Sequence, residues 1–521
     1  MFKLLAISTV FVSGSPGHVN VSHYDKIVLG CGAAGAFAAD LLIADGQTVG
    51  VLDAKLQCGG AVNTVDGQDF GVKAYLNTSA YVPLGFNFTF DMLGWAVDLV
   101  GEENITRFPA LGYQGPYITA DPNLGGALKF TFNSGNLTEA DILWLYDNLT
   151  TAYPELSFQA GFPADLDDSL RQNITSWVFS DPVYEKFGPM LEDACRGGGF
   201  DPDLVAFAYL VKDLVGFLLA YIRDGLLFAI KPGNQFLYDR MAQRIRDSAG
   251  SGLFLGASVS SVNLNGGSGP VSVQFTAADG SHHVMHGNDI VWAIPATPDF
   301  FSAVGVRNLP TAVSTACSNM TTHAGLYSLM LAEVSNPFGI PVVSVTNESA
   351  PLKQPAERGV VFLYNQTAGV WGGMAVTNNA SDDAATVTQA AHSNLSAIQN
   401  MTIPGYGFVC DLDLQIQQAW KHESYFVHFP IEKLQRHSYQ VLEEALCSGN
   451  MAIIGNGPGH SDTPLLNQKT IQTFAKCGFT GEARRRKLKA RRELRGRRQE
   501  RELQEVMRWV AQIPPYMRAE L

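Results

Sequence analysis

The chain has 521 residues, of which 46% are apolar and 16% are charged, and these values are typical of a globular protein that is large enough for two intertwined domains. The net charge of -13 is unevenly distributed along the chain, since residues 482–503 hold 11 Lys/Arg and 4 acidic residues. The rest of the chain has 25 basic and 45 acidic residues, a net charge of -20. An acidic body of this kind argues against a nucleic-acid-binding protein.

The first sixteen residues have the layout of a cleavable signal peptide. Lys3 supplies one positive charge, the run Leu4 to Val12 is apolar, and the small residues Ser13, Gly14 and Ser15 follow where a peptidase would cut. The alternative is a buried first strand or helix. We expect residues 1–16 to be removed and the protein to be secreted.

A second feature also favours an extracellular glycoprotein. Thirteen asparagines head Asn-X-Ser/Thr sequons, and a glycan forces its asparagine to the surface, so each of these positions is also predicted to be exposed. The sequons begin at Asn20, Asn77, Asn87, Asn104, Asn136, Asn148, Asn173, Asn319, Asn347, Asn365, Asn379, Asn394 and Asn400.

Cysteines and long apolar runs are both scarce. Seven cysteines are too few to define the fold of so long a chain, and Cys31, which lies in a Gly-rich turn, is expected to be a small buried filler rather than a disulfide partner. The most apolar later stretch, Leu204 to Tyr221, carries Lys212 and Asp213 at its centre, which favours a buried or amphipathic helix over a membrane span.

After the signal peptide the pattern is that of a strand-helix-strand unit. Residues 26–29 and 48–52 are apolar runs typical of buried strands, and residues 34–45 between them indicate a helix. A largely helical region follows from about residue 86 to 226, with helices predicted over residues 139–152, 182–196 and 201–221.

Strand character returns near residue 253. Asp279-Gly280 is a turn pair that suits a β-hairpin between residues 271–277 and 282–286. A last apolar strand at residues 451–454 leads through a Gly-rich turn into a helix at residues 464–477. The Arg/Lys-rich run beyond it is expected to be a solvated helix or a disordered tail, with a misread gene end as the alternative.

The first turn carries the main chemical signal, the sequence Gly30-Cys31-Gly32-Ala33-Ala34-Gly35 between a strand and a helix. The first glycine allows a tight turn, the second lets the backbone approach a diphosphate, and the third lets the helix pack closely on the strand. The helix N-terminus then offers N–H groups and a partial positive charge to the phosphates.

An acidic residue completes this dinucleotide-binding pattern. Asp53 follows Gly35 after 17 intervening residues, at the end of the second strand, where it can accept hydrogen bonds from ribose hydroxyls. A carboxylate there would repel a 2′-phosphate, so FAD or NAD is expected rather than NADP. The alternative is a Gly-rich turn that only packs, but such a turn would not require Asp53.

The residues after the acid favour FAD. The doublet Gly59-Gly60, followed by Asp66-Gly67-Gln68-Asp69-Phe70, resembles the glycine-doublet segment of the flavin amine oxidase superfamily, in which the doublet passes close to the cofactor. Members commonly carry Arg beside the doublet, where this chain has Ala61.

The resemblance continues at three later points. Residues 231–238 and 257–262 look like the return of the chain into the FAD domain, and Val259 matches the residue whose backbone contacts adenine. Residues 289–295 look like the strand and turn that close this lobe. Residues 454–463 resemble the last FAD segment, which implies cofactor contacts by Gly455, Asp462 and Thr463.

The order Gly-x-x-His-x-Asp in that last segment is more similar to secreted fungal flavoproteins of the β-cyclopiazonate oxidocyclase type than to monoamine oxidases. The resemblance implies an α/β fold, with a Rossmann-like FAD-binding domain of the amine-oxidase type and an interleaved α+β substrate domain. The expected division is a FAD domain at residues 24–85, 227–299 and 440–480, a substrate domain at residues 86–226 and 300–439, and a basic tail at residues 481–521.

Candidate catalytic residues lie near the last FAD segment. His460 adjoins the cofactor turn, although a histidine that caps the next helix would look the same. His422 and Tyr425 belong to an aromatic stretch, residues 420–429, that either forms a substrate wall or is a strand with buried aromatics. No metal-binding helix, paired CxxC or GxSxG elbow is present in the sequence, so no metal site is expected.

The expected function is a secreted FAD-dependent oxidoreductase that oxidises a small amine, an indole-like compound or another metabolite by hydride transfer to flavin, with O2 as re-oxidant. One alternative is a FAD-dependent dehydrogenase or desaturase that uses another acceptor. The other is a non-catalytic secreted glycoprotein with a degenerate flavin site.

Overall fold

The structure is a computed structural model, and it describes most of the central part of the chain. The predicted signal peptide and the basic tail lie outside the described residues. The described ranges are residues 19–62, 64–66, 75–77, 92–109, 118–120, 128–130, 139–158, 160–187, 191, 195, 203–212, 214–215, 226–231, 233–267, 269–333, 342–345, 362–367, 370–377, 381–389, 401–403, 408–410, 414–459 and 463–479.

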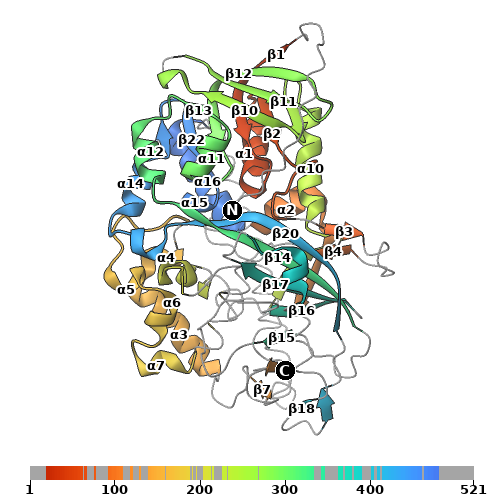
Figure 1. Cartoon of the computed structure of the whole chain (residues 1–521), viewed down its shortest axis with the longest axis vertical. Coiled ribbons are helices and arrows are strands. Elements are labelled where there is room, and N and C mark those ends of the chain that lie inside the picture. Colours follow the sequence, from red (N-terminus) through yellow and green to blue (C-terminus); the bar gives the residue numbers. More distant parts are fainter. Residues whose placement is uncertain are drawn as a thin grey trace, which may run out of the picture.

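The larger of the two main sheets contains the predicted strand-helix-strand unit (Figure 1). Its parallel part has the spatial order β9-β2-β1-β12-β22, so segments from three distant parts of the chain lie side by side. These strands are β1 (Asn20–Leu29), β2 (Val49–Asp53), β9 (Gly252–Leu255), β12 (His282–Trp292) and β22 (Met451–Ile453).

A further group of strands pairs with residues 282–287 of β12, on the same edge as β22, which pairs with residues 290–292. The group contains β11 (Val271–Thr276), β10 (Ser258–Asn263) and the short β13 (Val306–Arg307). Its pairings are antiparallel except that β13 runs parallel to β10. The predicted hairpin between β11 and β12 is confirmed, and Gly280 supplies the positive φ, +83°, that the turn requires. Because β13 pairs with β10, the first sheet extends a few residues past the predicted boundary at residue 299.

The strands β2 and β22 and the carboxyl-terminal ends of β1 and β12 are buried on both faces, which explains the continuous apolar runs there. One hydrophobic core cluster contains Val28, Val51 and Val291 together with side chains of four helices. The cluster on the other face of the sheet contains Ile27 and Trp292. The helices of the first cluster are α1 (Ala33–Ala44), α2 (Met92–Val100), α10 (Gln235–Asp247) and α16 (Thr463–Cys477).

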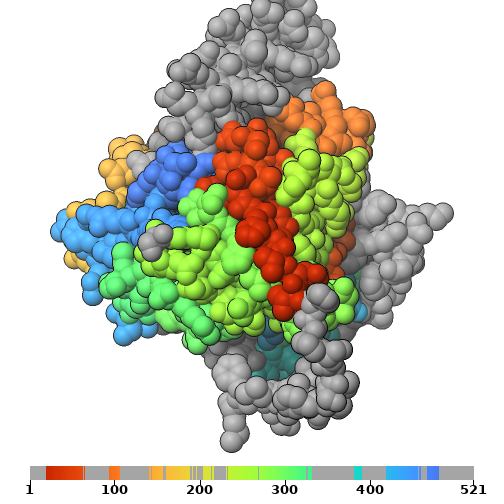
Figure 2. Space-filling view, turned by 90° about the horizontal axis from the view of Figure 1, so that it is seen from above, coloured from red at the N-terminus to blue at the C-terminus, as the bar shows by residue number. Residues whose placement is uncertain are grey.

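The central helix of this layer is α1, which contacts α10 on one side and α16 on the other. Figure 2 shows this arrangement from above, with the red N-terminal segment between the yellow-green and blue ones. The predicted helix at residues 464–477 is confirmed as α16, one residue longer at its start.

The second sheet has the order β20-β14-β17-β16-β15-β6-β7 and lies below the first in Figure 1. Its two longest strands, β14 (Thr321–Glu333) and β20 (Leu414–His428), pair antiparallel along most of their length. The others are β6 (Ile118–Ala120), β7 (Leu128–Phe130), β15 (Val342–Val345), β16 (Phe362–Thr367) and β17 (Val370–Thr377).

Three further sheets of the described residues have two strands each. They pair β3 (Thr64–Asp66) with β4 (Tyr75–Asn77), β5 (Ile105–Pro109) with β8 (Leu226–Ile230), and β18 (Met401–Ile403) with β19 (Phe408–Cys410).

Helices gather beside the second sheet, at the lower left of Figure 1. The helix predicted at residues 139–152 is confirmed as α3 (Glu139–Ala152), whereas the one predicted at residues 182–196 is interrupted: α7 (Pro182–Glu185) ends at Glu185, and residues 191 and 195 are helical again. The others are α4 (Pro154–Phe158), α5 (Asp168–Arg171) and α6 (Ile174–Val178).

The apolar stretch predicted to be a buried helix is buried at every described side chain from residue 205 to 215. Lys212 is only 2% exposed, and its ammonium lies 3.4 Å from the Leu156 carbonyl and 5.2 Å from the centre of the Phe162 ring. A carbonyl and an aromatic face both stabilise a buried cation. Among the described residues, no helix is long and apolar enough to cross a bilayer.

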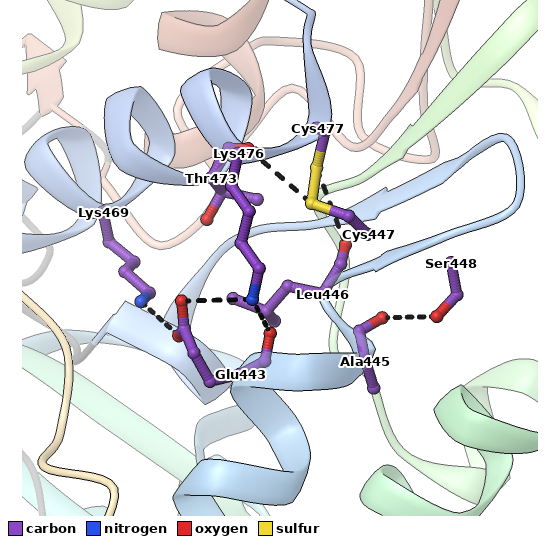
Figure 3. The surroundings of a disulfide bond; sticks show 9 residues. All are labelled: Glu443, Ala445, Leu446, Cys447, Ser448, Lys469, Thr473, Lys476 and Cys477. Atoms are coloured by element: carbon purple, nitrogen blue, oxygen red, sulfur yellow. Dashed lines mark hydrogen bonds and ion pairs between the residues drawn. A yellow bond between two sulfur atoms is a disulfide. The ribbon is translucent and has the colours of Figure 1, made fainter.

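A disulfide and two ion pairs connect the end of the first sheet and the preceding helix to α16 (Figure 3). The disulfide joins Cys447, in β21 (Cys447–Ser448), to Cys477 at the end of α16. In α14 (Ser438–Ala445), Glu443 pairs with the buried Lys469 and lies 3.7 Å from the ammonium of Lys476, so one side chain holds two lysines of α16.

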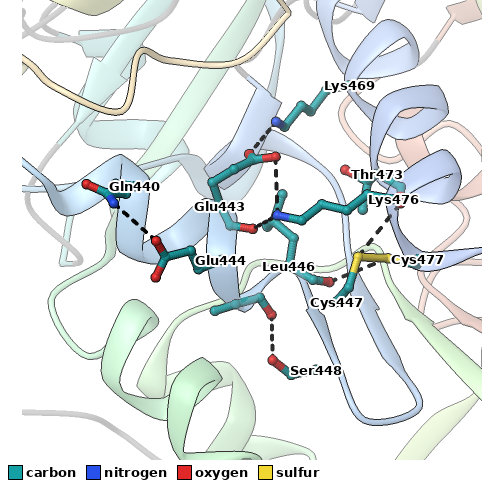
Figure 4. Close-up of polar contacts among 11 residues, drawn as sticks. Gln440, Glu443, Glu444, Leu446, Cys447, Ser448, Lys469, Thr473, Lys476 and Cys477 are labelled. Atoms are coloured by element: carbon teal, nitrogen blue, oxygen red, sulfur yellow. Dashed lines mark hydrogen bonds and ion pairs between the residues drawn. A yellow bond between two sulfur atoms is a disulfide. The ribbon is translucent and has the colours of Figure 1, made fainter.

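This carboxylate is expected to matter for stability. Replacing Glu443 by Gln leaves the Lys469 ammonium buried without a counter-charge, and we expect the free energy of unfolding to fall by about 1–3 kcal/mol. The matched control is Glu444→Gln, one residue later, because Glu444 is exposed and only accepts a hydrogen bond from Gln440 (Figure 4); it should change the same quantity by less than about 0.5 kcal/mol. Equal effects of the two variants in denaturant unfolding would contradict this account.

Candidate functional site

The Gly-rich turn lies where β1 ends and α1 begins. Gly30 has φ +97°, a conformation that favours glycine, and its N–H donates to the Leu52 carbonyl at 2.7 Å. A Cβ on Gly35 would lie 1.9 Å from the Gly30 carbonyl oxygen, so only a glycine lets the helix pack this closely on the turn. The first and third glycines therefore have the packing roles expected from the sequence.

The start of α1 presents main-chain groups without a side-chain cap. Gly32 is the N-cap residue, and the first turn of the helix contains no acidic residue. A Cβ placed on Gly32 would meet only the Gly60 Cα, at 3.6 Å, among the described atoms outside its chain neighbours. The positive end of the helix dipole therefore has no acidic partner in the first turn of α1. This arrangement suits an anion, which the N–H groups of Ala33, Ala34 and Gly35 would face.

Asp53 lies against this turn at the end of β2. Its carboxylate accepts hydrogen bonds from the Cys31 N–H at 2.5 Å and the Lys55 N–H at 2.8 Å, which fixes its orientation. Each carboxylate oxygen can accept a further hydrogen bond, for example from a ribose hydroxyl. The Ala257 N–H donates to the Asp53 carbonyl at 2.9 Å, so the strand that carries Val259 begins beside this acid.

The glycine doublet packs directly on the Gly-rich turn. Gly59 and Gly60 both have positive φ, and Gly59 forms a parallel β-bridge with Gly32. The Gly59 N–H donates to the Cys31 carbonyl at 2.7 Å, and a Cβ on Gly60 would lie 2.9 Å from the Gly32 Cα. Glycine at these positions is therefore required by the contact between the two segments.

The expectation that Cys31 is only a buried filler was wrong. Cys31 forms a disulfide with Cys58, the residue before the doublet, and both are almost completely buried. The β-bridge between the two segments brings their Cα atoms to 4.8 Å, within the range that a disulfide spans. The described cysteines thus include two disulfides, while Cys195 and Cys317 are buried outside them.

A second Gly-rich turn follows β22 at the same edge of the sheet. Gly455 has φ +102° and precedes α15 (Asn456–Gly459), and Thr463 then begins α16. A Cβ on Gly455 would lie 4.0 Å from the Ala293 carbonyl oxygen, and one on Gly30 would lie 3.0 Å from the same atom. The structure therefore brings both turns together around the end of β12. His460 and Asp462 lie outside the described residues.

The second sheet reaches this edge through the end of β20. The pairing of β14 with β20 shifts there, since Thr321 pairs with His428 but His323 pairs with Tyr425, which is the signature of a β-bulge. Ser424 and Phe426 have φ +54° and +55°, and a bulky residue in this conformation is strained. Strained residues and bulges both concentrate at functional sites.

This bulge packs on the second Gly-rich turn. A Cβ on Gly457, in α15, would lie 2.8 Å from the Met320 Cε and 3.5 Å from a Val427 methyl group. Tyr425 is buried at the bulge, whereas His422, also buried, pairs with Leu326 three residues further along the strand, about 10 Å away. Of the two β20 candidates, the structure thus brings Tyr425 to the bulge and leaves His422 farther along the strand.

Aromatic rings surround the strained Phe426. Its ring centre lies 5.7 Å from that of His323 and 5.2 Å from that of Tyr209. The Tyr209 hydroxyl contacts that of Tyr439, and burial raises the pKa of both hydroxyls well above their ordinary value, so both stay protonated. The cluster thus connects the helical region, through Tyr209, with α14, through Tyr439, and with the bulge, through Phe426.

His428, in the same cluster, has a lowered pKa. Burial lowers its pKa below the ordinary value of 6.5, against a hydrogen bond to the Phe426 carbonyl and the charge of Glu432, so the ring is neutral at neutral pH. Its Nδ1 donates to that carbonyl at 2.7 Å. Because a neutral imidazole carries one proton, Nε2 is left as an acceptor.

Sequence reasoning missed three members of this region, namely Met320, His323 and Tyr209. Met320 and His323 lie at the start of β14, and their relation to residues 425–428 depends on strand pairing. Tyr209 lies more than two hundred residues before Phe429, whose N–H donates to its hydroxyl at 3.4 Å. A local signal was present only for Phe426 and His428, as members of the aromatic stretch.

Solved structures with this arrangement include a fatty acid isomerase from P. acnes that produces CLA, with a TM-score of 0.66, 13% identity, and coverage of 87% of this chain and 98% of the other. Putrescine oxidase bound to putrescine has a TM-score of 0.60 at 16% identity, with coverage of 88% and 99%. Cyclohexylamine oxidase from Brevibacterium oxydans IH-35A has a TM-score of 0.56 at 15% identity, with coverage of 87% and 99%.

The chain has the amine oxidase fold. The α/β fold class and the resemblance to flavin amine oxidases are thereby confirmed for the fold. The closer likeness to the β-cyclopiazonate oxidocyclase type stays a prediction, as does the division into domains. No protein-family model and no curated protein sequence matches the chain.

The residues around the turn fit the ADP part of FAD. Gly32 leaves a position that a side chain would fill, the N-terminus of α1 has no side-chain cap, and Asp53 holds a fixed carboxylate next to both. The position beside the doublet where the resemblance implies Arg is Ala61, and it is half-buried. The nearby cation is Lys55, whose ammonium donates to the Gly60 carbonyl at 2.7 Å.

Two alanine variants separate cofactor binding from folding. Gly32→Ala adds a methyl group to a position with room for it in the protein, so we expect the stability without cofactor to change by less than about 1 kcal/mol and FAD affinity to fall at least about tenfold. Gly35→Ala forces the helix off the Gly30 carbonyl and should lower stability by about 2–3 kcal/mol. Denaturant unfolding and FAD titration measure the two effects. Unchanged FAD affinity in Gly32→Ala would contradict the assignment of this turn.

Proposed function

We propose that this protein is a FAD-dependent oxidoreductase of the amine oxidase type, which oxidises a small amine, an indole-like compound or another small metabolite. The observation that carries the proposal is the uncapped N-terminus of α1, with the glycine doublet on one side and the fixed carboxylate of Asp53 on the other. This combination suits a diphosphate joined to a ribose.

The proposed cofactor contacts come from four segments at one edge of the first sheet. The turn and helix start bind the diphosphate, Asp53 binds the ribose, and the backbone of Val259 contacts the adenine. The complete proposed set is Gly30, Gly32, Ala33, Ala34, Gly35, Asp53, Gly59, Gly60, Val259, Gly455, Asp462 and Thr463. When bound, FAD supplies the acceptor for two electrons and a hydride.

The substrate is proposed to lie against the bulge of β20. Tyr425, Phe426 and His428 are buried aromatic side chains at this bulge, and the lowered pKa of His428 keeps its ring neutral, which favours a neutral, apolar substrate over an ionic one. An amine must lose its ammonium proton before it can give up a hydride, and Nε2 of a neutral His428 can accept a proton. His460 remains a proposed catalytic residue from the sequence.

Two amine oxidases among the similar structures support amines as the first substrate class to test. Mixing the flavin-loaded protein with primary amines and indole-like compounds without oxygen should bleach the flavin absorbance near 450 nm for at least one of them. Admitting O2 should then restore the colour and produce peroxide. His428→Asn should slow the bleaching about tenfold or more without loss of bound flavin.

The outcomes of this experiment separate the candidate functions. Bleaching that O2 does not reverse, but an added acceptor does, would favour a dehydrogenase or desaturase. A protein that takes up no flavin would be the non-catalytic glycoprotein and would refute the proposal.

We propose in addition that the protein is secreted and glycosylated. Supporting this, none of the five sequon asparagines with described side chains is buried: Asn20 and Asn319 are exposed, and Asn104, Asn148 and Asn173 are half-buried. Two disulfides are also typical of proteins from oxidising compartments.

Expression in a eukaryotic secretory host tests this second proposal. The protein in the medium should begin near residue 17 and should gain gel mobility after treatment with a glycan-removing enzyme. An uncleaved, unglycosylated protein retained in the cell would refute it.

A further inference from the structure

The disulfide between Cys31 and Cys58 occupies an unusual place, because each cysteine belongs to a different glycine motif. Cys31 lies between the first two glycines of the Gly-rich turn, and Cys58 directly precedes the doublet. The bond therefore links the proposed diphosphate-binding turn to the segment that faces it. The other described disulfide, Cys447–Cys477, joins β21 to the far end of α16.

Non-covalent contacts between the two motifs are few and weak by comparison. The Gly59 N–H donates to the Cys31 carbonyl, and the doublet is further held by Lys55 and by Gln235, whose amide donates to the Cys58 carbonyl at 2.7 Å. Lys55 is exposed, so its hydrogen bond competes with water. Gly59 and Gly60 have no side chains that pack, and both adopt conformations that cost backbone entropy.

The cross-link also acts on the acid that faces the ribose. The Cys31 N–H donates to the Asp53 carboxylate, and the Cys31 carbonyl accepts from Gly59. Because its side chain, its N–H and its carbonyl are all bonded, Cys31 keeps Asp53 and the doublet in fixed positions relative to the turn. Loss of the disulfide frees the side chain and leaves the doublet to the hydrogen bonds of Gly59, Lys55 and Gln235.

The geometry points to Cys31 and Cys58 as positioning residues for the cofactor: their disulfide holds the glycine doublet against the diphosphate-binding turn before FAD arrives. The two glycine-rich segments are then already ordered, so FAD binding does not carry the conformational-entropy cost of ordering them. This inference rests on the proposed function. It makes the affinity for FAD higher in an oxidising compartment, where the cross-link forms.

The first test compares two double variants of the full chain, Cys31→Ala with Cys58→Ala, and Cys447→Ala with Cys477→Ala as the matched control. Both lose one disulfide that closes a loop of similar length, 27 against 30 residues apart, so the entropic part of the loss of stability should be similar, although Cys447–Cys477 is half-buried and Cys31–Cys58 is buried. Only the first should weaken FAD binding, by about tenfold or more, in a fluorescence titration. FAD affinity within about twofold of the unmodified protein would overturn the inference.

The second test uses the unmodified protein and so does not depend on a variant that folds. Reciprocity requires that bound FAD protect the Cys31–Cys58 disulfide from reduction by the same factor by which the disulfide favours FAD. In a dithiothreitol buffer each disulfide takes two electrons and two protons to become two thiols, while the reagent forms its cyclic disulfide. Alkylation and peptide mass spectrometry then give the reduced fraction of each pair.

Saturating FAD should shift the reduction equilibrium of Cys31–Cys58 about tenfold or more and leave that of Cys447–Cys477 unchanged. An equal shift of both pairs, or of neither, would overturn the inference. If the unmodified protein fails to bind FAD at all, the proposed function fails instead, and the two failures are thus distinguishable.

Discussion

The contact between the Gly-rich turn and the glycine doublet is the constraint on which the rest of the proposed site depends. Gly32 and Gly59 form a backbone bridge, Gly60 packs against the Gly32 Cα with no room for a side chain of its own, and Gly35 lets α1 begin directly behind them. Asp53 is oriented by the Cys31 N–H, which lies in this same contact, together with the Lys55 N–H. A side chain at Gly60 or Gly35 would therefore push the doublet or the start of α1 away from the turn.

The parallel sheet explains why segments so distant in sequence meet here. The carboxyl ends of β1, β12 and β22 lie next to one another, and a Gly-rich turn follows both β1 and β22. The second sheet adds the strained end of β20, which packs on the later turn through Val427. A cofactor bound at the sheet edge and a substrate bound at the bulge would therefore be adjacent, as a hydride transfer requires.

The local part of this architecture could be predicted from the sequence, and the non-local part could not. The strand-turn-helix around Gly30 and the acid at Asp53 are determined by neighbouring residues, so their pattern is visible in the sequence. The disulfide of Cys31 and the partner of Tyr425 depend on which segments meet in space. The helix predicted over residues 182–196 is interrupted after Glu185, which apolar spacing does not reveal, whereas its start is marked by the capping Asp181.

A calorimetric titration of the purified protein with FAD, FMN and riboflavin tests the central claim most directly. All three contain the same flavin ring, but only FAD carries the diphosphate and the adenosine ribose that the turn and Asp53 are assigned to bind. The account predicts that one FAD binds per chain and that FMN and riboflavin bind at least about a hundredfold more weakly. Equal affinity for the three compounds, or no binding of FAD, would contradict it.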